Sequence, residues 1–298
     1  KATQASILMK NTGLVIANDY NEKRSEILSE NVERLGITNT IVLNNNIDKI
    51  ANHFGGYFDK VILDAPCSGE GMFRKNDLSY LDWSIDKVHR CSEIQRELIM
   101  HAYSLLKKDG IMVYSTCTFE KEENEDIVQY LLDNSNASLI YIKEIEGAIR
   151  GIDMKEAIRL YPSHFKGEGQ FIALIKCNDE HNIKLKKYQN KNNQIPQLFK
   201  LTNEFILQNS NNNKIKDIYP FNTTINYLEY GNINIDGLKV KRYGLNMGQV
   251  INNRFEPSHS LMKVLDLKQN HEITKDEYLK FIKGETLENN NYKGYLGI

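Results

Sequence analysis

The most constraining feature of this chain is an apolar run that leads into a loop rich in reactive side chains. Residues 61–63 are Val-Ile-Leu, and they precede Asp64-Ala65-Pro66-Cys67-Ser68-Gly69-Glu70-Gly71-Met72-Phe73-Arg74-Lys75. A short apolar run that ends in Asp, followed by Pro and Gly, predicts a buried strand that opens into a loop. In a doubly wound sheet, ligands bind at the carboxyl ends of the strands. We therefore expect this loop to hold a carboxylate, a thiol and two glycines at a site of chemistry.

A second cysteine has the same setting further along the chain. Residues 111–114 are Ile-Met-Val-Tyr, and Ser115-Thr116-Cys117-Thr118 follow them. A single free cysteine is most often a small buried core residue. A purely structural thiol would not require the Pro that precedes Cys67 or the glycines that follow it, so the surroundings of Cys67 favour a functional role. A reactive cysteine acts as its thiolate. From chemistry alone, Cys67 and Cys117 are equal candidates for a nucleophile.

Composition bounds the class of protein. The 298 residues, 41% of them hydrophobic, suffice for one large domain and a smaller one. No run of about eighteen apolar residues occurs, so no membrane span is predicted. Four widely spaced cysteines without a C-x-x-C pair argue against a zinc site and favour a reducing, cytoplasmic location. One of them, Cys91, falls on the apolar stripe of a helix predicted over residues 84–106, which predicts a core position.

Charge is unevenly distributed along the chain. The formal net charge is −1, yet residues 181–298 hold 17 Lys and Arg against 11 Asp and Glu, whereas residues 1–180 hold 21 against 28. The basic half could meet nucleic acid. A lysine-rich surface that keeps the protein in solution is an equally good explanation of charge alone.

The segments before the first loop predict further strands with polar ends. Residues 13–17 form a buried strand that ends at Asn18-Asp19, and an acidic residue at this place grips ribose hydroxyls in such folds; a helix cap is the alternative for Asp19. An amphipathic helix follows over residues 21–35. Residues 40–43 form the next strand and lead into Asn44-Asn45-Asn46, which an ordinary turn also explains.

The later segments complete the picture. Glu122, Glu123 and Glu125 suit the N-terminal dipole of a helix, with a metal cluster as the alternative. Residues 159–175 predict a closing antiparallel hairpin. Residues 178–236 are rich in Asn and Lys, with a thin helix near 197–208, and short strand-like runs broken by Gly follow from Gly237.

The loops Asp64–Lys75 and Ser115–Thr118 together resemble the two signature loops of the Nop/Sun family of RNA (cytosine-5)-methyltransferases, in particular the RsmF-like bacterial ribosomal-RNA branch. The resemblance implies an α/β fold: a class I, Rossmann-like methyltransferase sheet with a C-terminal small β-rich, PUA-like domain. It implies an S-adenosylmethionine-dependent methyltransferase domain over residues 1–178, a linker and connecting segment over 179–236, and a PUA-like RNA-binding domain over 237–298.

The resemblance also assigns roles to single residues. It implies Cys117 as the nucleophile, Cys67 as the thiol that helps to release the product, and Asp64 as the group that holds the base near the methyl donor. DNA cytosine-5 methyltransferases use a Pro-Cys thiol, which would favour Cys67 as the nucleophile instead. For S-adenosyl-L-methionine, the resemblance implies Asp19, Arg24, Asn44 and Asp64, although a solvated helix face explains Arg24 nearly as well, and Asn45 could replace Asn44.

The function implied is methyl transfer to C5 of a cytosine in RNA, foremost ribosomal RNA, through a covalent cysteine adduct. A transfer-RNA methyltransferase and a non-catalytic RNA-binding assembly factor on the same scaffold are the alternatives, and a DNA methyltransferase is a weaker one. We expect RNA as the partner, no membrane, no metal and a monomer. Family members carry a first strand and a Gly-rich turn before the helix at residues 2–9. We expect that residues 1–298 lack this N-terminal part and alone bind the cofactor poorly.

Overall fold

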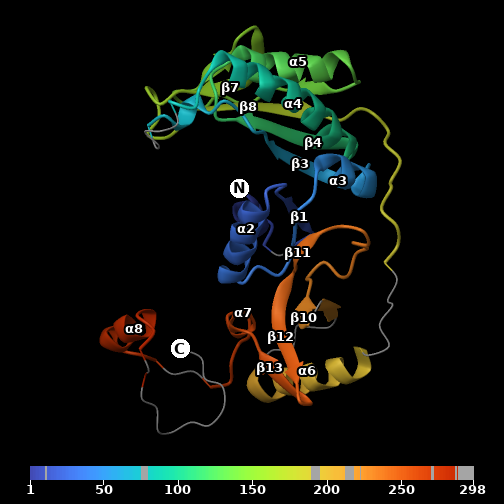
Figure 1. The fold of residues 1–298 in the computed structure, drawn as a ribbon, viewed down its shortest axis with the longest axis vertical. Coiled ribbons are helices and arrows are strands. Elements are labelled where there is room, and N and C mark those ends of the chain that lie inside the picture. Colours follow the sequence, from blue (N-terminus) through green and yellow to red (C-terminus); the bar gives the residue numbers. More distant parts are fainter. Residues whose placement is uncertain are drawn as a thin grey trace. The chain divides into compact units, whose positions relative to one another are not determined.

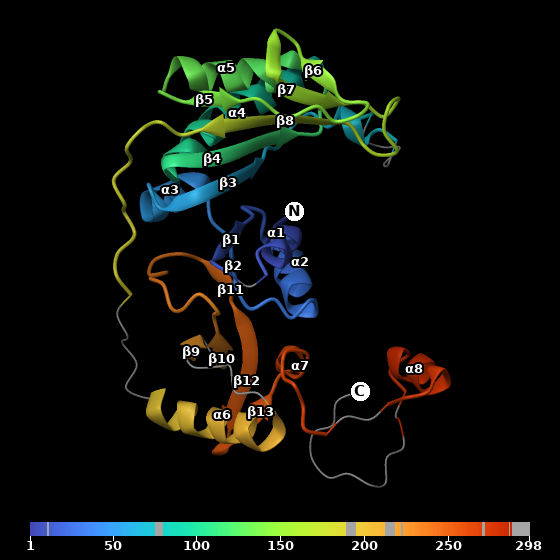
Figure 2. The ribbon, with the colours of Figure 1, turned by 180° about the vertical axis from the view of Figure 1, so that it is seen from behind.

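The chain folds into two compact units in a computed structural model, which describes residues 1–10, 12–74, 80–188, 195–211, 218–221, 223–269, 272–285 and 287. One unit is Asn46–Lys186, and the other combines Lys1–Asn45 with Lys187–Ile298 (Figures 1 and 2). No helix in the described ranges combines the length and the apolarity that crossing a bilayer requires.

The unit Asn46–Lys186 is built on one mixed sheet with the strand order β3-β4-β8-β7-β6. β3 (Phe58–Asp64) and β4 (Leu106–Thr116) are parallel, as expected for strands that lead into the two cysteine loops. The remaining strands pair antiparallel, and they are β8 (Gln170–Lys176), β7 (Met154–Leu160), β6 (Ile149–Gly151) and β5 (Ser138–Ile140), the last of which pairs with β8. β7 and β8 confirm the predicted closing hairpin.

Three helices accompany this sheet, and they are α3 (Ile47–Phe54), α4 (Ile85–Ser104) and α5 (Glu125–Asp133). α4 packs against both α3 and α5, and α4 and α5 lie together over the sheet (Figure 1). The Ser84 side chain caps α4 by accepting a hydrogen bond from the Lys87 N–H. The core prediction for Cys91 is wrong because the buried stripe of α4 runs through Ser92, Gln95 and Ile99, which leaves Cys91 only half-buried.

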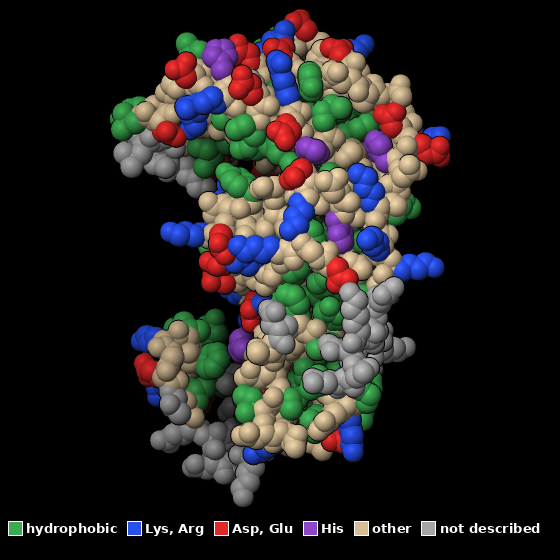
Figure 3. Space-filling model, turned by 45° about the vertical axis from the view of Figure 1, so that its right-hand side comes forward, with side chains coloured by type: hydrophobic (Ala, Val, Ile, Leu, Met, Phe, Trp, Pro, Cys, Tyr) green, Lys and Arg blue, Asp and Glu red, His purple; other side chains and the backbone are tan. Residues whose placement is uncertain are grey.

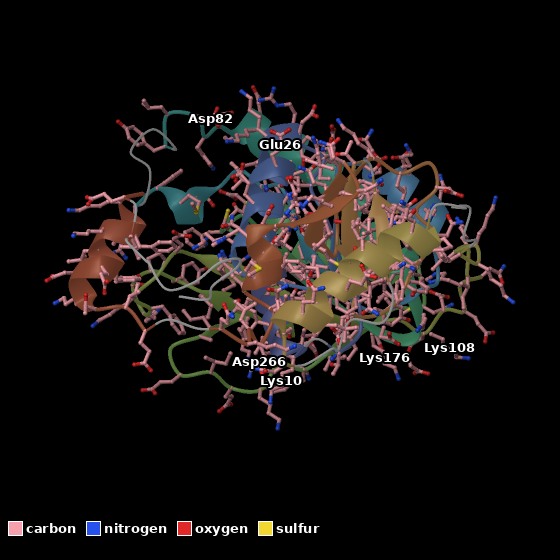
Figure 4. All side chains as sticks on the ribbon, turned by 90° about the horizontal axis from the view of Figure 1, so that it is seen from below. Lys10, Glu26, Asp82, Lys108, Lys176 and Asp266 are labelled. Carbon is pink, nitrogen blue, oxygen red and sulfur yellow. The ribbon has the colours of Figure 1, made fainter. Side chains whose placement is uncertain are left out.

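The second unit contains a three-stranded sheet with the order β1-β2-β11. β1 (Val15–Asn18) and β2 (Thr40–Leu43) are parallel. In the sequence, α1 (Ala2–Leu8) precedes β1, and α2 (Glu22–Arg34) connects β1 to β2. β11 (Val240–Tyr243) joins antiparallel to β2, with Tyr243 opposite Ile41. Lys241 of β11 pairs with Glu22 at 2.9 Å and with Glu26, labelled in Figure 4, at 3.1 Å, so ion pairs fasten this strand to α2.

A second, four-stranded sheet and its helices form the rest of the described part of this unit. Its order is β13 (Arg254–Pro257), β12 (Leu245–Ile251), β10 (Thr224–Tyr227) and β9 (Tyr219–Phe221), and its helices are α6 (Ile195–Asn209), α7 (His259–Met262) and α8 (Lys275–Ile282). Phe205, Ile206, Ile225, Met247 and Leu261 form its core. α6 confirms the predicted helix near residues 197–208, and the strands confirm a β-rich C-terminal module.

The surface carries charges of both signs. Acidic and basic side chains are interspersed on the face in Figure 3. Lys176 pairs with Asp109 at 2.7 Å, and Lys108 lies toward the same edge of the view in Figure 4. On the described part of the face in Figure 3, basic side chains are therefore interspersed with acidic ones rather than gathered in one patch.

Candidate active site

Two loops that follow neighbouring parallel strands bring the predicted thiols together. The strand register places Asp64 opposite Ser115, so β3 and β4 end at the same edge of the sheet. The Sγ atoms of Cys67 and Cys117 lie 3.2 Å apart, and the backbone N–H of Cys117 donates a hydrogen bond to the Cys67 Sγ at 3.3 Å. Both cysteines are thiols rather than disulfide partners, and both are half-buried. The two catalytic candidates are therefore in direct contact.

Asp64 lies at the end of β3 with its side chain exposed. The Ser115 hydroxyl lies 3.5 Å from the Asp64 Oδ1. The backbone N–H of Ala65 donates to the carbonyl oxygen of Ser115 at 3.0 Å, which ties the start of the first loop to the end of β4. The carboxylate is thus accessible to a ligand at the carboxyl end of the sheet.

The contact between the thiols shifts the pKa of Cys67. The hydrogen bond to Cys117, burial, and the charge of a Cys117 thiolate raise the pKa of the Cys67 thiol well above its usual range. Two groups that interact this strongly lose their protons in sequence. The contact therefore disfavours two adjacent thiolates, and the member of the pair that keeps its proton can donate a hydrogen bond to the other sulfur.

Hydrogen bonds and one close approach hold the loops against each other. The first loop contains a 3-10 turn, η1 (Glu70–Met72), and Glu70 accepts hydrogen bonds from the Phe119 N–H at 2.7 Å and the Thr118 hydroxyl at 3.0 Å. The Gly71 N–H donates to the carbonyl oxygen of Cys117 at 2.8 Å. A Cβ on Gly71 would lie 2.7 and 2.9 Å from two backbone carbonyl oxygens, so only glycine permits this approach.

A buried carboxylate that the sequence analysis did not assign to the site connects the same loops. Glu123 ends the 3-10 turn η2 (Lys121–Glu123) and is 0% exposed. It accepts hydrogen bonds from the Ser68 N–H and the Ser68 hydroxyl of the first loop, and the Thr118 hydroxyl of the second loop, whose shorter hydrogen bond goes to Glu70, lies 3.3 Å from it. The side chain of the neighbouring Glu122 is 51% exposed. A run of acidic residues gives no sequence signal that one of them is buried.

A buried ion pair that the sequence analysis did not predict holds the second loop in place. Arg159 of β7 donates from Nε to the Glu125 Oε1 at 2.7 Å and from a second nitrogen to the other carboxylate oxygen. Arg159 also donates to the carbonyl oxygen of Phe119 at 2.7 Å. The ring of Phe119 stacks on that of Tyr161, with 4.9 Å between the centroids. The closing hairpin thereby fixes the loop that carries Cys117.

Three predicted cofactor residues cluster in the other unit, at the carboxyl ends of β1 and β2. Asp19 accepts a hydrogen bond from the Asn21 N–H at 2.9 Å and pairs with the Arg24 Nε at 2.9 Å. The Asn44 amide donates to the carbonyl oxygens of Asp19 and Tyr20, each at 2.9 Å. The alternative, Asn45, makes its amide bonds to the backbone of Lys239, beside β11. Asn44, rather than Asn45, is therefore the asparagine that contacts Asp19.

Metal ligands do not gather in the part of the chain that the structure describes. No group of three or more His, Cys, Asp or Glu side chains there could hold an ion. Glu123 and Glu125, two of the acids considered for a metal cluster, instead bind protein hydrogen-bond donors.

Comparisons with known proteins agree with this arrangement. Residues 1–176 match the family model "16S rRNA methyltransferase RsmB/F", and residues 204–265 match "RsmF rRNA methyltransferase first C-terminal domain". Over 179 residues the chain is 35% identical to a ribosomal RNA small subunit methyltransferase F of Shewanella amazonensis, an alignment that covers 59% of this chain and 38% of that protein. It is 38% identical over 193 residues to a tRNA (cytosine(49)-C(5))-methyltransferase of Pyrococcus abyssi, covering 59% of this chain and 60% of that one.

A solved structure shows the same fold. NSun6 from Pyrococcus horikoshii with SFG superposes with a TM-score of 0.51 at 28% identity, over 60% of this chain and 45% of that chain. The chain spans about two fifths of the length of the ribosomal-RNA relative described above. Because the first family model covers more than half of its residues, the chain belongs to the 16S rRNA methyltransferase RsmB/F family.

Proposed function

We propose that this protein transfers a methyl group from S-adenosyl-L-methionine to C5 of a cytosine in RNA, with ribosomal RNA as the substrate class. The observation that carries the proposal is the contact between Cys67 and Cys117 at the carboxyl ends of β3 and β4. The Shewanella relative is named for ribosomal RNA, and a second family model, for an RsmF C-terminal domain, matches residues 204–265. A transfer-RNA substrate is the second candidate because the Pyrococcus relative is named for one.

Cys117 supplies the nucleophile in this scheme. Its thiolate adds to C6 of the cytosine, and the electron pair of the C5–C6 double bond moves toward C5, N3 and the exocyclic carbonyl system. C5 then becomes nucleophilic enough to accept a methyl group. The covalent adduct thus divides one difficult reaction into two easier steps. The methyl group itself is what S-adenosyl-L-methionine supplies when bound. The contact with Cys67 supports this role because a thiol 3.2 Å from the Cys117 sulfur can donate a hydrogen bond to it when it is a thiolate.

Cys67 takes part in release. Once the Cys117 sulfur is bonded to C6, it carries no negative charge, so the two Cys117 contributions that raise the pKa of Cys67 disappear. Cys67 is then a stronger acid than in the free protein; its proton passes to solvent water, and the resulting thiolate can accept the C5 proton. The C5 electron pair re-forms the double bond, the C6–S bond breaks, and the sulfur departs as the Cys117 thiolate.

The remaining candidates fit binding roles. The exposed Asp64 carboxylate can accept hydrogen bonds from the exocyclic amine of cytosine and from a protonated N3. Carboxylate oxygens also accept from hydroxyl groups, so Asp19, positioned by Arg24 and Asn44, suits the ribose hydroxyls of S-adenosyl-L-methionine. A target cytosine would have to leave its stack to reach the thiols.

Trapping with a fluorinated base tests the nucleophile. RNA that contains 5-fluorocytosine blocks removal of the C5 substituent, so the covalent protein–RNA complex accumulates and migrates slowly on a denaturing gel. Cys117→Ala should abolish the complex, and Cys91→Ala, which alters a half-buried thiol of α4, should not. A complex that forms with Cys117→Ala but not with Cys67→Ala would reverse the assignment.

A second measurement separates catalysis from a binding-only role. Mass spectrometry of ribosomal and transfer RNA from cells that lack the gene should show the loss of one 5-methylcytosine. Intact 5-methylcytosine in both RNA classes, together with altered ribosome assembly, would favour the non-catalytic assembly factor.

A further inference from the structure

The buried carboxylate of Glu123 has no role in the chemistry described above, yet it contacts both cysteine loops. Ser68 directly follows Cys67, and its N–H donates to Glu123 at 2.9 Å while its hydroxyl donates to the other carboxylate oxygen. Thr118 directly follows Cys117, and its hydroxyl lies 3.3 Å from Glu123. One side chain is therefore bonded to the neighbour of each thiol.

A third element completes the surroundings of this carboxylate. Gln95 of α4 donates from Nε2 to Glu123 at 3.0 Å and to the carbonyl oxygen of Pro66 at 2.7 Å. Pro66 precedes Cys67, so Gln95 and Glu123 together hold the backbone on both sides of that cysteine. Gln95 and Glu123 are each 0% exposed, and Ser68 is 2% exposed.

The partners of Glu123 all act as donors. An ionised carboxylate accepts from all of them, whereas an amide of the same shape fits only if the hydroxyls turn round to accept its N–H groups, and its hydrogen bonds lose their charge assistance. Burial raises the pKa of the Glu123 carboxyl, and the hydrogen bonds from Ser68, Gln95 and Thr118 oppose that shift. The net shift of the pKa is upward, and wherever the carboxyl is ionised its hydrogen bonds are the strong, charge-assisted ones.

We propose that Glu123 is a positioning residue whose carboxylate locks the two cysteine loops together and so holds the Cys67 and Cys117 thiols at contact distance. The structural part of this proposal, that Glu123 sets the spacing of the thiols, rests only on the observed contacts. The consequence for catalysis rests on the proposed methyl transfer, because in that scheme Cys117 attacks and Cys67 assists its release. The charge of Glu123 additionally raises the pKa of Cys67, so the same carboxylate helps to keep that thiol protonated.

A trivalent arsenical measures the spacing without any RNA. Phenylarsine oxide forms two As–S bonds only with adjacent thiols, and the two thiol protons leave with the oxide oxygen as water, with no change of redox state. The wild-type protein should bind one equivalent, and Cys67→Ala and Cys117→Ala should each abolish tight binding. Glu123→Gln should weaken binding at least about tenfold, the scale of one lost hydrogen bond to a charged group. Glu122→Gln, in the same 3-10 turn but exposed, should bind like wild type.

A milder variant covers the case in which Glu123→Gln does not fold. Ser68→Ala removes one hydroxyl donor and leaves the backbone donor in place, so it should weaken arsenical binding about threefold, less than a full charge-assisted hydrogen bond. Wild-type affinity in a folded Glu123→Gln protein would overturn the proposal. If that variant does not fold, wild-type affinity in Ser68→Ala would do so.

Kinetic measurements distinguish a positioning role from a general loss of stability. They also allow the inference about Glu123 to fail independently of the proposed function. Glu123→Gln should lower kcat for methyl transfer at least about tenfold with an unchanged KM for RNA, because the loops position the reacting thiols rather than bind the RNA. Arsenical binding that depends on Glu123, in a protein that binds S-adenosyl-L-methionine yet methylates no RNA, would refute the proposed function and leave the positioning role intact. Methyl transfer with equal kcat in wild type and Glu123→Gln would refute the positioning role and leave the function intact.

Discussion

Replacing Arg159 by Met should destabilise the unit Asn46–Lys186 more than any change to a surface ion pair in the same region. Arg159 and Glu125 are each only 3% exposed at their side chains and form a bidentate pair. Glu125 also accepts a hydrogen bond from the Ile152 N–H at 2.8 Å. Met fills a similar volume but donates no hydrogen bond, so the substitution leaves the Glu125 carboxylate buried without its cation.

The structure sets the size of this effect. Removing one partner of a buried ion pair costs about 3–5 kcal/mol, because the remaining charge stays out of water. For a unit of this size, each kcal/mol lowers the melting temperature by roughly 3 °C, so Arg159→Met should melt about 10 °C or more below wild type. Arg159→Met combined with Glu125→Gln should recover part of the loss, since the double variant buries no unpaired charge.

Thermal unfolding followed by circular dichroism measures all three proteins, and a double-mutant cycle gives the coupling between the two side chains. Lys121→Met is the matched control. It breaks the exposed Lys121–Asp153 pair, whose N–O distance is 3.2 Å, and should leave the melting temperature close to that of wild type, because water screens exposed ion pairs. If Arg159→Met costs no more than Lys121→Met, the argument from burial is wrong.

Three further outcomes follow from the structure. Gly71→Ala places a Cβ 2.7 and 2.9 Å from two backbone carbonyl oxygens and should cost about 1–3 kcal/mol of unfolding free energy, measured by urea denaturation, whereas Gly167→Ala, with no atom within 4 Å of its Cβ, should cost much less. Hydrogen bonds from Lys241 and Lys239 lower the pKa of Glu22 from 4.5 to about 2, so its stabilising effect is present above pH 4.5 and is lost as the pH falls toward 2; the melting temperatures of wild type and Glu22→Gln should differ at pH 6 and converge near pH 2, and a constant difference would contradict this assignment. Cys67→Ala should accumulate protein–RNA adduct with ordinary cytosine, seen on denaturing gels, and normal turnover without adduct would remove Cys67 from the release step.

The sequence predicted the features that depend on short segments. Short apolar runs and helical periodicity favour local structure, so β1, β2, α2 and the antiparallel hairpin of β7 and β8 lie close to where their patterns place them. The two cysteine loops could also be placed side by side, because parallel neighbouring strands end at the same edge of a sheet. Their contact at Cys67 and Cys117 is therefore a consequence of two local patterns and one rule of topology.

What tertiary structure alone decided is which polar side chains are buried and which distant segments pair. Glu122 and Glu123 are adjacent and chemically identical, yet only Glu123 is removed from water, because Ser68 and Gln95 arrive from a loop and a helix elsewhere in the chain to satisfy it. β2 likewise reads as an ordinary buried strand, and nothing in it names β11, about two hundred residues away, as its antiparallel partner. Burial of a charge and choice of a strand partner depend on groups brought together by the whole fold, and a local pattern carries no record of them.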